Sequence, residues 1–388
     1  MELHTKPIMP KGFSCASVNC GLKEKGNDLS VFYSDAPASA AAVFTRNQFP
    51  GAPVILGKQI IKKGELQAIV VNSKISNVGT GEQGLANAKR MATAIAKEFS
   101  INENLVIMSS TGVIGKQLKI DLIENGICGI SSKLVSDPLV GAHGIMTTDT
   151  YPKALSMNVG NATLTMVGKG AGMIEPNMAT MLVYIFTDAK IGYKELDSML
   201  RQAVCDSFNM LSVDTDTSTS DTCAILANGL SGEVDKLMFL ESLKFGCIEM
   251  TKKIARDGEG ATKLLISKIQ GAASYDEARI IAKSIVNSPL IKTMAYGADP
   301  NIGRVLMAVG KCFSCKVTPS KIEVMINGTL VYKNMERVDF NEDSVRELLS
   351  GEVVEIVVNL NLGDGSATAY GCDLTQGYIE ENAAYYSS

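Results

Sequence analysis

The chain has 388 residues, 46% of them hydrophobic, and a net charge of -4 at pH 7. This length and composition suffice for two or three globular domains with buried cores. Its Lys and Arg residues are scattered along a slightly acidic chain, so we expect neither nucleic acid nor an anionic membrane as a partner. The sequence lacks a signal-peptide pattern and an apolar run of membrane-spanning length, so we expect a cytoplasmic protein.

The first half of the chain alternates short apolar runs with longer helical patterns, which indicates a mixed α/β fold. A buried strand is expected at residues 67–72, followed by a helix whose apolar face runs through residues 85–99. A second strand, 105–108, leads into Ser109-Ser110-Thr111-Gly112. The pattern therefore places a glycine turn at the end of a strand.

The middle of the chain places a threonine between a glycine-rich segment and a strand. Residues 164–167 are typical of a strand, residues 168–172 hold three glycines, and residues 181–186 form another apolar strand. The intervening loop delivers Thr180 to the first position of that second strand. A helix is expected over residues 193–208, and a polar loop over 214–222.

The C-terminal third is expected to form a smaller α+β domain. Ser274 and Glu277 have the spacing of a capping box at the start of a helix. We place the domain boundary just before that helix, giving a core domain of residues 1–270 and a second domain of 271–388.

Several common site motifs are excluded by residue type. The nine cysteines are odd in number and widely spread, which favours reduced thiols over a disulfide framework. Cys312 and Cys315 form a CxxC pair, but the sequence nearby lacks the further cysteines or histidines of a zinc site. None of the four Gly-Lys pairs is followed by the Ser or Thr of a phosphate-binding loop. Only two histidines, His4 and His143, are present, so a His-based triad has at most one credible base. We expect no metal site.

A nucleophile without a histidine base is possible at a chain N-terminus. An N-terminal threonine carries its own α-amine, with a pKa of about 8, within reach of its hydroxyl. The sequence Lys-Gly-Ala-Gly-Met-Ile-Glu-Pro-Asn-Met-Ala-Thr-Met-Leu at residues 169–182 resembles the processing segment of the ornithine acetyltransferase family of arginine biosynthesis. Further segments resemble motifs of that family in the same order, at residues 147–150, 212–219, 257–263 and 299–304.

The resemblance implies a layered α/β sandwich with two central sheets covered by helices, beside the smaller C-terminal domain. It implies self-cleavage between Ala179 and Thr180 into fragments 1–179 and 180–388, which stay together and pair as α2β2. Thr180 would then carry an acetyl group from N2-acetylornithine to glutamate in two ping-pong steps. No cofactor is expected, and use of acetyl-CoA as a second acetyl donor is left open.

The resemblance also gives roles to individual residues. Thr111 and Gly112 would form the oxyanion hole, which typically contributes about 3 to 4 kcal/mol per donor. Lys169 suits a substrate carboxylate and Glu259 an ammonium group. The implied substrate-binding residues are Thr147, Lys169, Thr180, Glu259, Asn382 and Ser387. Ser388 is an alternative to Ser387, because the chain is one residue longer than the family pattern at this end.

Two departures from the family pattern concern segments near these residues. Lys74, Ile75 and Val78 replace a run of the type Gly-Asn-Ala-x-Ala/Cys, which could alter a loop beside the site. The spacing from Thr147 to Lys169 is about four residues short, which we interpret as a shortened hairpin with both ends in place.

Two alternatives remain open at this point. An aminopeptidase or amidase with an N-terminal nucleophile would use water as the acceptor in place of glutamate. A non-catalytic relative would bind amino acids without turnover. Glutamate-dependent release of ornithine separates transferase from hydrolase, and an uncut chain on a denaturing gel would favour the non-catalytic relative.

Overall fold

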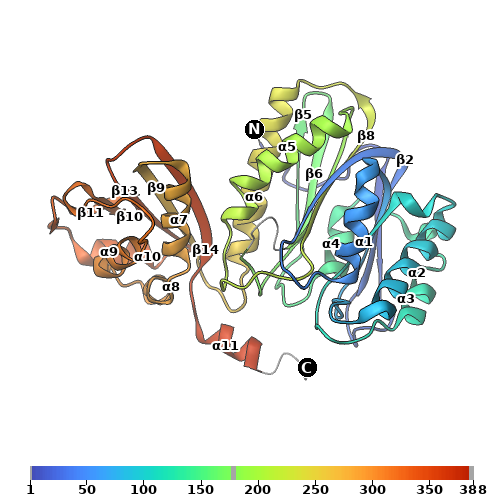
Figure 1. Cartoon of the computed structure of the whole chain (residues 1–388), viewed down its shortest axis with the longest axis horizontal. Helices are drawn as coiled ribbons and strands as arrows, with labels where there is room; N and C mark the ends of the chain where they lie inside the picture. The colour runs from blue at the N-terminus through green and yellow to red at the C-terminus, as the bar shows by residue number, and fades with distance from the viewer. Residues whose placement is uncertain (1, 176–180, 384–388) are drawn as a thin grey trace. The chain divides into compact units, whose positions relative to one another are not determined.

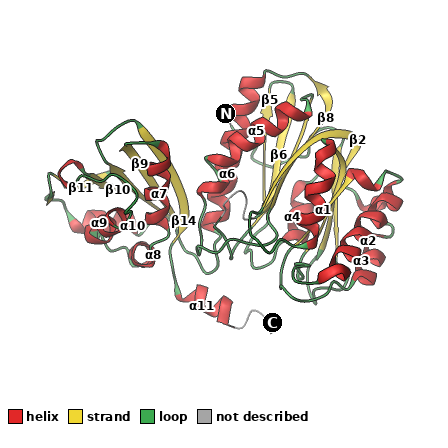
Figure 2. Ribbon diagram, viewed as in Figure 1, coloured by secondary structure: helices red, strands yellow, loops and turns green. Residues whose placement is uncertain are grey.

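The computed structural model describes residues 2–175 and 181–383. The chain divides into two units, each with helices and strands (Figure 2). The first comprises residues 1–170, 176–209 and 217–250, and the second residues 171–175, 210–216 and 251–388.

The first unit contains an eight-stranded sheet in the order β4-β3-β2-β8-β7-β6-β5, with β1 paired beside β2. The β3–β4 and β7–β8 pairs are parallel, and the other pairs are antiparallel. The strands are β1 (Phe13–Val18), β2 (Leu29–Phe44), β3 (Glu65–Asn72), β4 (Val106–Ser110), β5 (Lys153–Val159), β6 (Ala162–Lys169), β7 (Leu182–Ala189) and β8 (Thr222–Gly232).

This sheet doubles back on itself through its long strand β2. The register of β2 against β3 shifts between Tyr33 and Ala38, and only the part beyond the shift pairs with β8. Phe32, before the shift, stacks on Phe186 of β7 with ring centroids 5.2 Å apart. Phe13 of β1 lies 5.4 Å from the same ring. One continuous sheet therefore makes two facing layers with an apolar core between them.

Helices cover the outer face of each layer (Figure 1). The periodic apolar face of α2, with Ala88, Met91 and Ile95 fully buried, packs on β3 and β4. On the other layer, Gly246 of α6 fits against Met166 of β6. The helices of this unit are α1 (Ala52–Ile60), α2 (Gly81–Phe99), α3 (Ile120–Ile127), α4 (Pro138–Ile145), α5 (Tyr193–Cys205) and the first part of α6 (Lys236–Arg256).

The second unit has a six-stranded sheet in the order β12-β11-β10-β13-β9-β14. Helix α7 packs on β9 and β14, and its N-cap Ser274 accepts a hydrogen bond from the Glu277 amide, as the capping box predicted. The strands are β9 (Leu264–Ala272), β10 (Glu323–Ile326), β11 (Thr329–Lys333), β12 (Glu336–Arg337), β13 (Val353–Asn359) and β14 (Gly365–Cys372). The helices are α7 (Tyr275–Val286), α8 (Pro289–Tyr296), α9 (Ile302–Gly310), α10 (Glu342–Leu349) and α11 (Gln376–Ala383).

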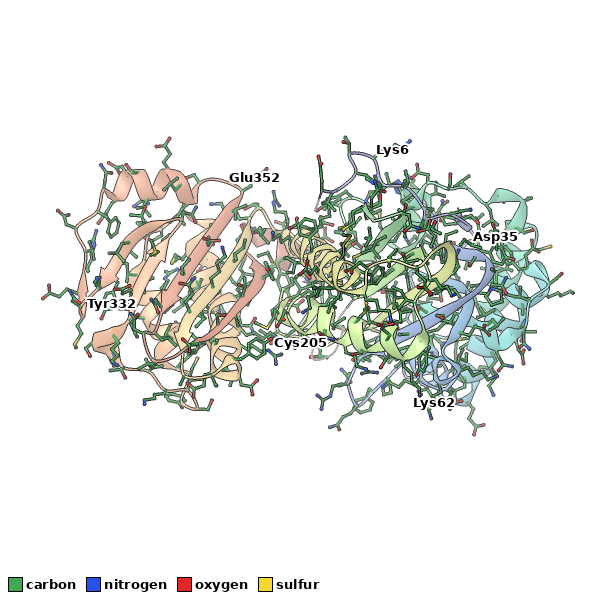
Figure 3. The ribbon with its side chains drawn as sticks, turned by 90° about the horizontal axis from the view of Figure 1, so that it is seen from above. Lys6, Asp35, Lys62, Cys205, Tyr332 and Glu352 are labelled. Carbon is green, nitrogen blue, oxygen red and sulfur yellow. The ribbon has the colours of Figure 1, made fainter. Side chains whose placement is uncertain are left out.

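Charged side chains of both signs project from the surface of each unit, among them Lys62, Asp35 and Glu352 (Figure 3). Within the described ranges, no helix combines the length and apolar character needed to cross a membrane.

The predicted mixed α/β fold with two sheets and helical layers is confirmed. The predicted boundary at 270/271 differs from the observed division, because β9 (Leu264–Ala272) is hydrogen-bonded between β13 and β14 and so belongs to the second sheet. The predicted cut between Ala179 and Thr180 lies outside the described residues. The fragments 1–179 and 180–388 therefore stay a prediction.

Candidate active site

The site of the first unit begins where β3 and β4 end. These strands are parallel, so their carboxyl ends meet at one edge, with Asn72 opposite Ser110. The Asn72 side chain accepts a hydrogen bond from the Ser110 hydroxyl at 2.6 Å and donates to the Ile75 carbonyl at 2.8 Å. The Thr111 amide donates to the Asn72 carbonyl at 3.0 Å. A fully buried asparagine thus fixes the turns that follow both strands.

Gly112 occupies a position that only glycine fits. Its φ is +126°, and a Cβ there would lie 2.3 Å from the carbonyl carbon and oxygen of Lys74. Val113 donates its amide to that same Lys74 carbonyl at 3.0 Å. Among the described residues, the Gly112 amide has no hydrogen-bond acceptor. A rigid turn therefore presents an N–H group that is available to a ligand, as an oxyanion hole requires.

Lys169 brings two predicted threonines together. It is the last residue of β6 and is 7% exposed. Its ammonium group donates to the Thr147 hydroxyl at 2.9 Å and to the Thr111 hydroxyl at 3.3 Å. β5 and β6 lie between Thr147 and Lys169 and form a tight hairpin, in which Val159 pairs with Ala162. Thr111, Gly112, Thr147 and Lys169 thus form one cluster.

Asp149 holds this cluster in place electrostatically. Its buried carboxylate accepts from the Lys153 ammonium at 2.8 Å, from the Thr147 amide at 3.0 Å and from the Gly170 amide at 2.9 Å. Burial alone would raise the pKa of Asp149, but the positive charges of Lys169 and Lys153 lower it to about 2. Asp149 is therefore ionised at neutral pH and stabilises the buried Lys169 cation.

The second unit holds the chain segment that precedes the predicted cut. The Asp214 carboxylate accepts from the amides of Met173 at 2.6 Å and Ile174 at 2.8 Å. Burial raises the pKa of Asp214. The Val213 amide donates to the Ile174 carbonyl at 2.7 Å. The polar loop expected from the sequence thus anchors residues 173–174.

Glu259 and Asn382, two of the predicted substrate-binding residues, contact each other in the second unit. The Asn382 side-chain amide donates to the Glu259 carboxylate at 2.7 Å, and the Glu259 backbone amide donates to the Ala171 carbonyl at 2.9 Å. A Cβ on Gly172 would lie 2.2 Å from a carboxylate oxygen of Glu259, so the glycine permits this close approach. Glu259 is 9% exposed, and its carboxylate suits a substrate ammonium group.

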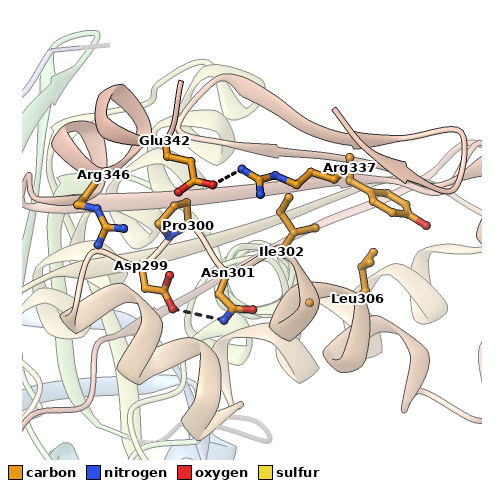
Figure 4. Close-up of a pocket in the computed structure, with 10 residues that line it drawn as sticks. Asp299, Pro300, Asn301, Ile302, Leu306, Arg337, Glu342 and Arg346 are labelled. Carbon is orange, nitrogen blue, oxygen red and sulfur yellow. Dashed lines mark hydrogen bonds and ion pairs between the residues drawn. The ribbon is translucent and has the colours of Figure 1, made fainter. Parts of the chain in front are cut away.

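The motif at residues 299–304 has a structural explanation and lines a separate cavity of about 430 Å³ (Figure 4). Asn301 caps α9 by accepting a hydrogen bond from the Arg304 amide. Asp299 accepts from the Asn301 side chain at 3.3 Å, and Arg337 pairs with Glu342 across the cavity wall.

In the motif at residues 257–263, Lys263 stabilises the ends of two helices. The Lys263 ammonium group donates to the last carbonyls of two helices, Ala295 of α8 at 2.8 Å and Leu349 of α10 at 2.7 Å. It therefore caps both helices from inside the unit.

Three of the predicted site residues, Ala179, Thr180 and Ser387, lie outside the described residues, as does the alternative Ser388. Three contributors were missed from the sequence: Asn72, Asp149 and Lys153. Asp149 stands inside a quoted motif, and its position beside Thr147 was the available signal. The roles of Asn72 and Lys153 depend on strand pairing that the sequence pattern does not reveal.

Comparison with known proteins identifies the family of the chain. The model of the ArgJ family matches residues 14–387. The chain belongs to the ArgJ family. The arginine biosynthesis bifunctional protein ArgJ 2 of Clostridium acetobutylicum is 48% identical over 380 residues, which cover 97% of this chain and 98% of that protein. Glutamate N-acetyltransferase Oat2 of Streptomyces clavuligerus is 40% identical over 386 residues, covering 98% of each.

A crystal structure of the ArgJ protein from Bacillus halodurans matches with a TM-score of 0.50 and 38% identity, covering 52% of this chain and 98% of that chain. The family predicted from the sequence is thereby confirmed, and with it an acyltransferase of arginine biosynthesis.

Proposed function

We propose that this ArgJ-family chain cleaves itself between Ala179 and Thr180 and then transfers an acetyl group from N2-acetylornithine to glutamate through Thr180. The observation that carries the proposal is the cluster of Lys169, Thr111 and Thr147 beside the available amide of Gly112. Leu182, two residues beyond Thr180, pairs directly with Lys169 in the β6–β7 ladder, which supports a role for Thr180 beside this cluster.

The cleavage step needs a nucleophile and a stabilised oxyanion. The Thr180 hydroxyl attacks the Ala179 carbonyl, and an N-to-O acyl shift converts the amide into an ester. The shift frees the amine of Thr180. Water then hydrolyses the ester, which releases a carboxylate on Ala179 and restores the Thr180 hydroxyl. The crystal chain from Bacillus halodurans corresponds to about half of this chain, which fits a precursor cut near its middle.

The transfer reaction uses the same groups twice. The free α-amine of Thr180 takes the proton of its own hydroxyl as that hydroxyl attacks the acetyl carbonyl, and ornithine leaves as an amine. The amine of glutamate then attacks the acetyl-threonine ester and carries the acetyl group away. Gly112 N–H and the Thr111 hydroxyl stabilise the oxyanion in both steps, while Lys169 binds the substrate carboxylate and Glu259 the substrate ammonium.

An acetyl-transfer assay with labelled acetylornithine tests this proposal. We expect label in acetylglutamate, ornithine release that depends on glutamate, and parallel lines in a plot of reciprocal rates at several glutamate concentrations. Release of free acetate at the same rate with and without glutamate would instead indicate the amidase. Thr111→Val, which retains size but removes the hydroxyl, should lower kcat by about 10²-fold.

Three further expectations belong to the proposal and need their own measurements. Replacing acetylornithine by acetyl-CoA in the same assay tests the second acetyl donor. Sedimentation of the purified protein tests the α2β2 assembly. Fractionation of the producing cells tests the cytoplasmic location.

A further inference from the structure

Glu175 is the last described residue before the predicted cut, and both its backbone and its side chain are held. Its amide donates to the Asp216 carbonyl at 3.0 Å. One oxygen of its carboxylate accepts from the Lys283 ammonium group at 2.9 Å, and the other accepts from the Asn287 side-chain amide at 2.9 Å. The Ser212 hydroxyl donates to that second oxygen at 3.4 Å. The chain that leads to the cut is therefore fixed at residue 175 within the second unit.

Two of the donors to Glu175 lie at the carboxyl end of α7. Lys283 is in the last turn of this helix, and Asn287 is its C-cap. The negative end of a helix dipole disfavours a carboxylate, and the Lys283 charge offsets this effect. The Lys283 and Glu175 side chains are 19% and 21% exposed, so water screens this pair less than an ion pair on the open surface. The position of the Glu175 carboxylate therefore depends on the Lys283 charge.

Asn287 donates to Glu175 although this leaves its own side-chain oxygen unpaired. The Asn287 Oδ1 is buried and has no hydrogen-bond donor among the described residues. A buried polar atom without a partner lowers stability. The reverse orientation of the side-chain amide would place Oδ1 against the Glu175 carboxylate, and two acceptors cannot form a hydrogen bond. The observed orientation therefore keeps the bond to Glu175.

The two residues before Glu175 are also held, and one of them is strained. Met173 has a φ of +54°, in the left-handed region that a residue with a Cβ adopts at a cost in stability. The Asp214 carboxylate accepts the amides of Met173 and Ile174 and so holds this conformation. Strained backbone that its surroundings hold in place is typical of functional segments. The proposed acetyl-transfer step uses no group of residues 173–175, which leaves the cleavage step as the reaction that they serve.

Self-cleavage is a reaction between two neighbouring residues, so the local course of the chain decides whether it occurs. The Thr180 hydroxyl must come within about 3 to 3.5 Å of the Ala179 carbonyl carbon, in the correct direction. Four residues of chain, the separation of Glu175 from Ala179, span at most about 14 Å. A fixed residue 175 therefore limits the conformations that the chain can adopt at the cut. After cleavage Ala179 is no longer joined to Thr180, so this restraint no longer reaches the nucleophile through the chain.

We propose that Glu175, held by Lys283 and Asn287, is a positioning residue for self-cleavage that has no part in acetyl transfer. The assignment rests on the proposed function, in which Thr180 attacks the Ala179 carbonyl. Glu175 acts through the backbone, because it limits the course of the chain that carries this carbonyl. The rate of cleavage therefore depends on Glu175, whereas the rate of acetyl transfer by the cut protein does not.

Four variants separate the charge of the pair from general effects on the second unit. Glu175→Gln removes the negative charge and keeps the size of the side chain. Lys283→Met removes the ammonium group and keeps the aliphatic chain, and Lys283→Arg keeps the positive charge. Lys268→Met is the matched control, because Lys268 forms an ion pair with Glu355 at 2.6 Å in the same unit.

The first readout is the rate of cleavage of the full chain. Each protein is made by cell-free synthesis with labelled methionine, synthesis is stopped, and loss of the uncut chain is followed on denaturing gels. Glu175→Gln and Lys283→Met should slow cleavage about tenfold or more. Lys283→Arg should restore most of the rate, and Lys268→Met should be cut as fast as the wild type.

The second readout is acetyl transfer after prolonged incubation, expressed per cut chain. The kcat and the KM values for acetylornithine and glutamate should stay within about twofold of the wild type in all four variants. A role confined to general stability would not produce this difference between the two reactions. It would also not be restored specifically by Lys283→Arg.

Three results would overturn the assignment: wild-type cleavage rates in both Glu175→Gln and Lys283→Met, slow cleavage in Lys283→Met that Lys283→Arg does not restore, or an equal loss of cleavage rate and of kcat per cut chain. A wild-type chain that stays uncut would overturn the proposed function itself. The wild type is measured first, so the two failures are distinguishable.

Discussion

Gly112→Ala is expected to damage both the turn and the reaction. The added Cβ would lie 2.3 Å from the Lys74 carbonyl carbon and oxygen, well inside van der Waals contact, so that peptide must move by about 1 Å. The positive φ of +126° adds backbone strain of about 1 to 3 kcal/mol. Together these effects should lower the free energy of unfolding by about 2 to 4 kcal/mol.

The catalytic effect follows from the displaced N–H group. Loss of one oxyanion donor typically lowers kcat by about 10² to 10³-fold, and the same loss should slow self-cleavage. Gly115→Ala is the matched control: Gly115 has a φ of +82° in the same turn, but a Cβ there meets no atom within 4 Å. Gly115→Ala should lower the free energy of unfolding by about 1 kcal/mol and change kcat little.

The assays are urea unfolding and the rate of acetyl transfer for both glycine variants. A Gly112→Ala protein with wild-type kcat would refute the assignment of Gly112 to the oxyanion hole. If Gly115→Ala is as inactive as Gly112→Ala, the turn tolerates no side chain at either position. The loss of activity could then not be assigned to the contact between residue 112 and the Lys74 carbonyl.

Three further changes test the electrostatics and the second unit. Asp149→Asn removes the carboxylate that pairs with the buried Lys153 ammonium group and should lower the free energy of unfolding by about 3 kcal/mol at pH 7. The pKa of Asp149 is about 2 in the folded protein, against an ordinary 3.8, so the carboxylate takes up a proton more readily in the unfolded chain. The free energy of unfolding of the wild type should therefore fall by about 2 kcal/mol between pH 5 and pH 2. Acid titration of the variant should lack this fall. Lys263→Met removes the ammonium donor to the Ala295 and Leu349 carbonyls and should lower the free energy of unfolding by about 2 to 3 kcal/mol in urea unfolding. Asn382→Ala removes the hydrogen bond to the Glu259 carboxylate and should raise KM for acetylornithine about threefold or more in steady-state assays, with self-cleavage unchanged.

Local sequence patterns predicted the elements well. The helix expected over residues 85–99 is α2, the strand expected at 67–72 lies within β3, and the capping box at Ser274 begins α7. These predictions depend on spacing and capping within short segments, where the sequence carries the physical information directly.

Long-range pairing was not predictable in the same way. The doubling of the first sheet depends on the register shift in β2 and on the packing of Phe32 against a strand about 150 residues later. The position of β9 in the second sheet likewise depends on pairing with β13, far along the chain. The boundary at 270/271 differs from the observed division for this reason.

The candidate site shows the same contrast. The resemblance supplied Thr111, Thr147 and Lys169 from separate motifs, and the structure joins them through the Lys169 ammonium group. Lys153, which stabilises Asp149, lies outside every quoted motif. A single buried lysine in a strand has no periodicity or spacing that would mark it as part of a site.

The most direct test of the central claim is intact-mass spectrometry of the denatured protein, for wild type and Thr180→Ala, before and after incubation with acetylornithine alone. The account predicts two fragments cut between Ala179 and Thr180 in the wild type, an uncut variant, and one added acetyl group on the fragment that begins at Thr180. An uncut wild-type chain that still transfers acetyl groups, or an acetyl group on the other fragment, would contradict it.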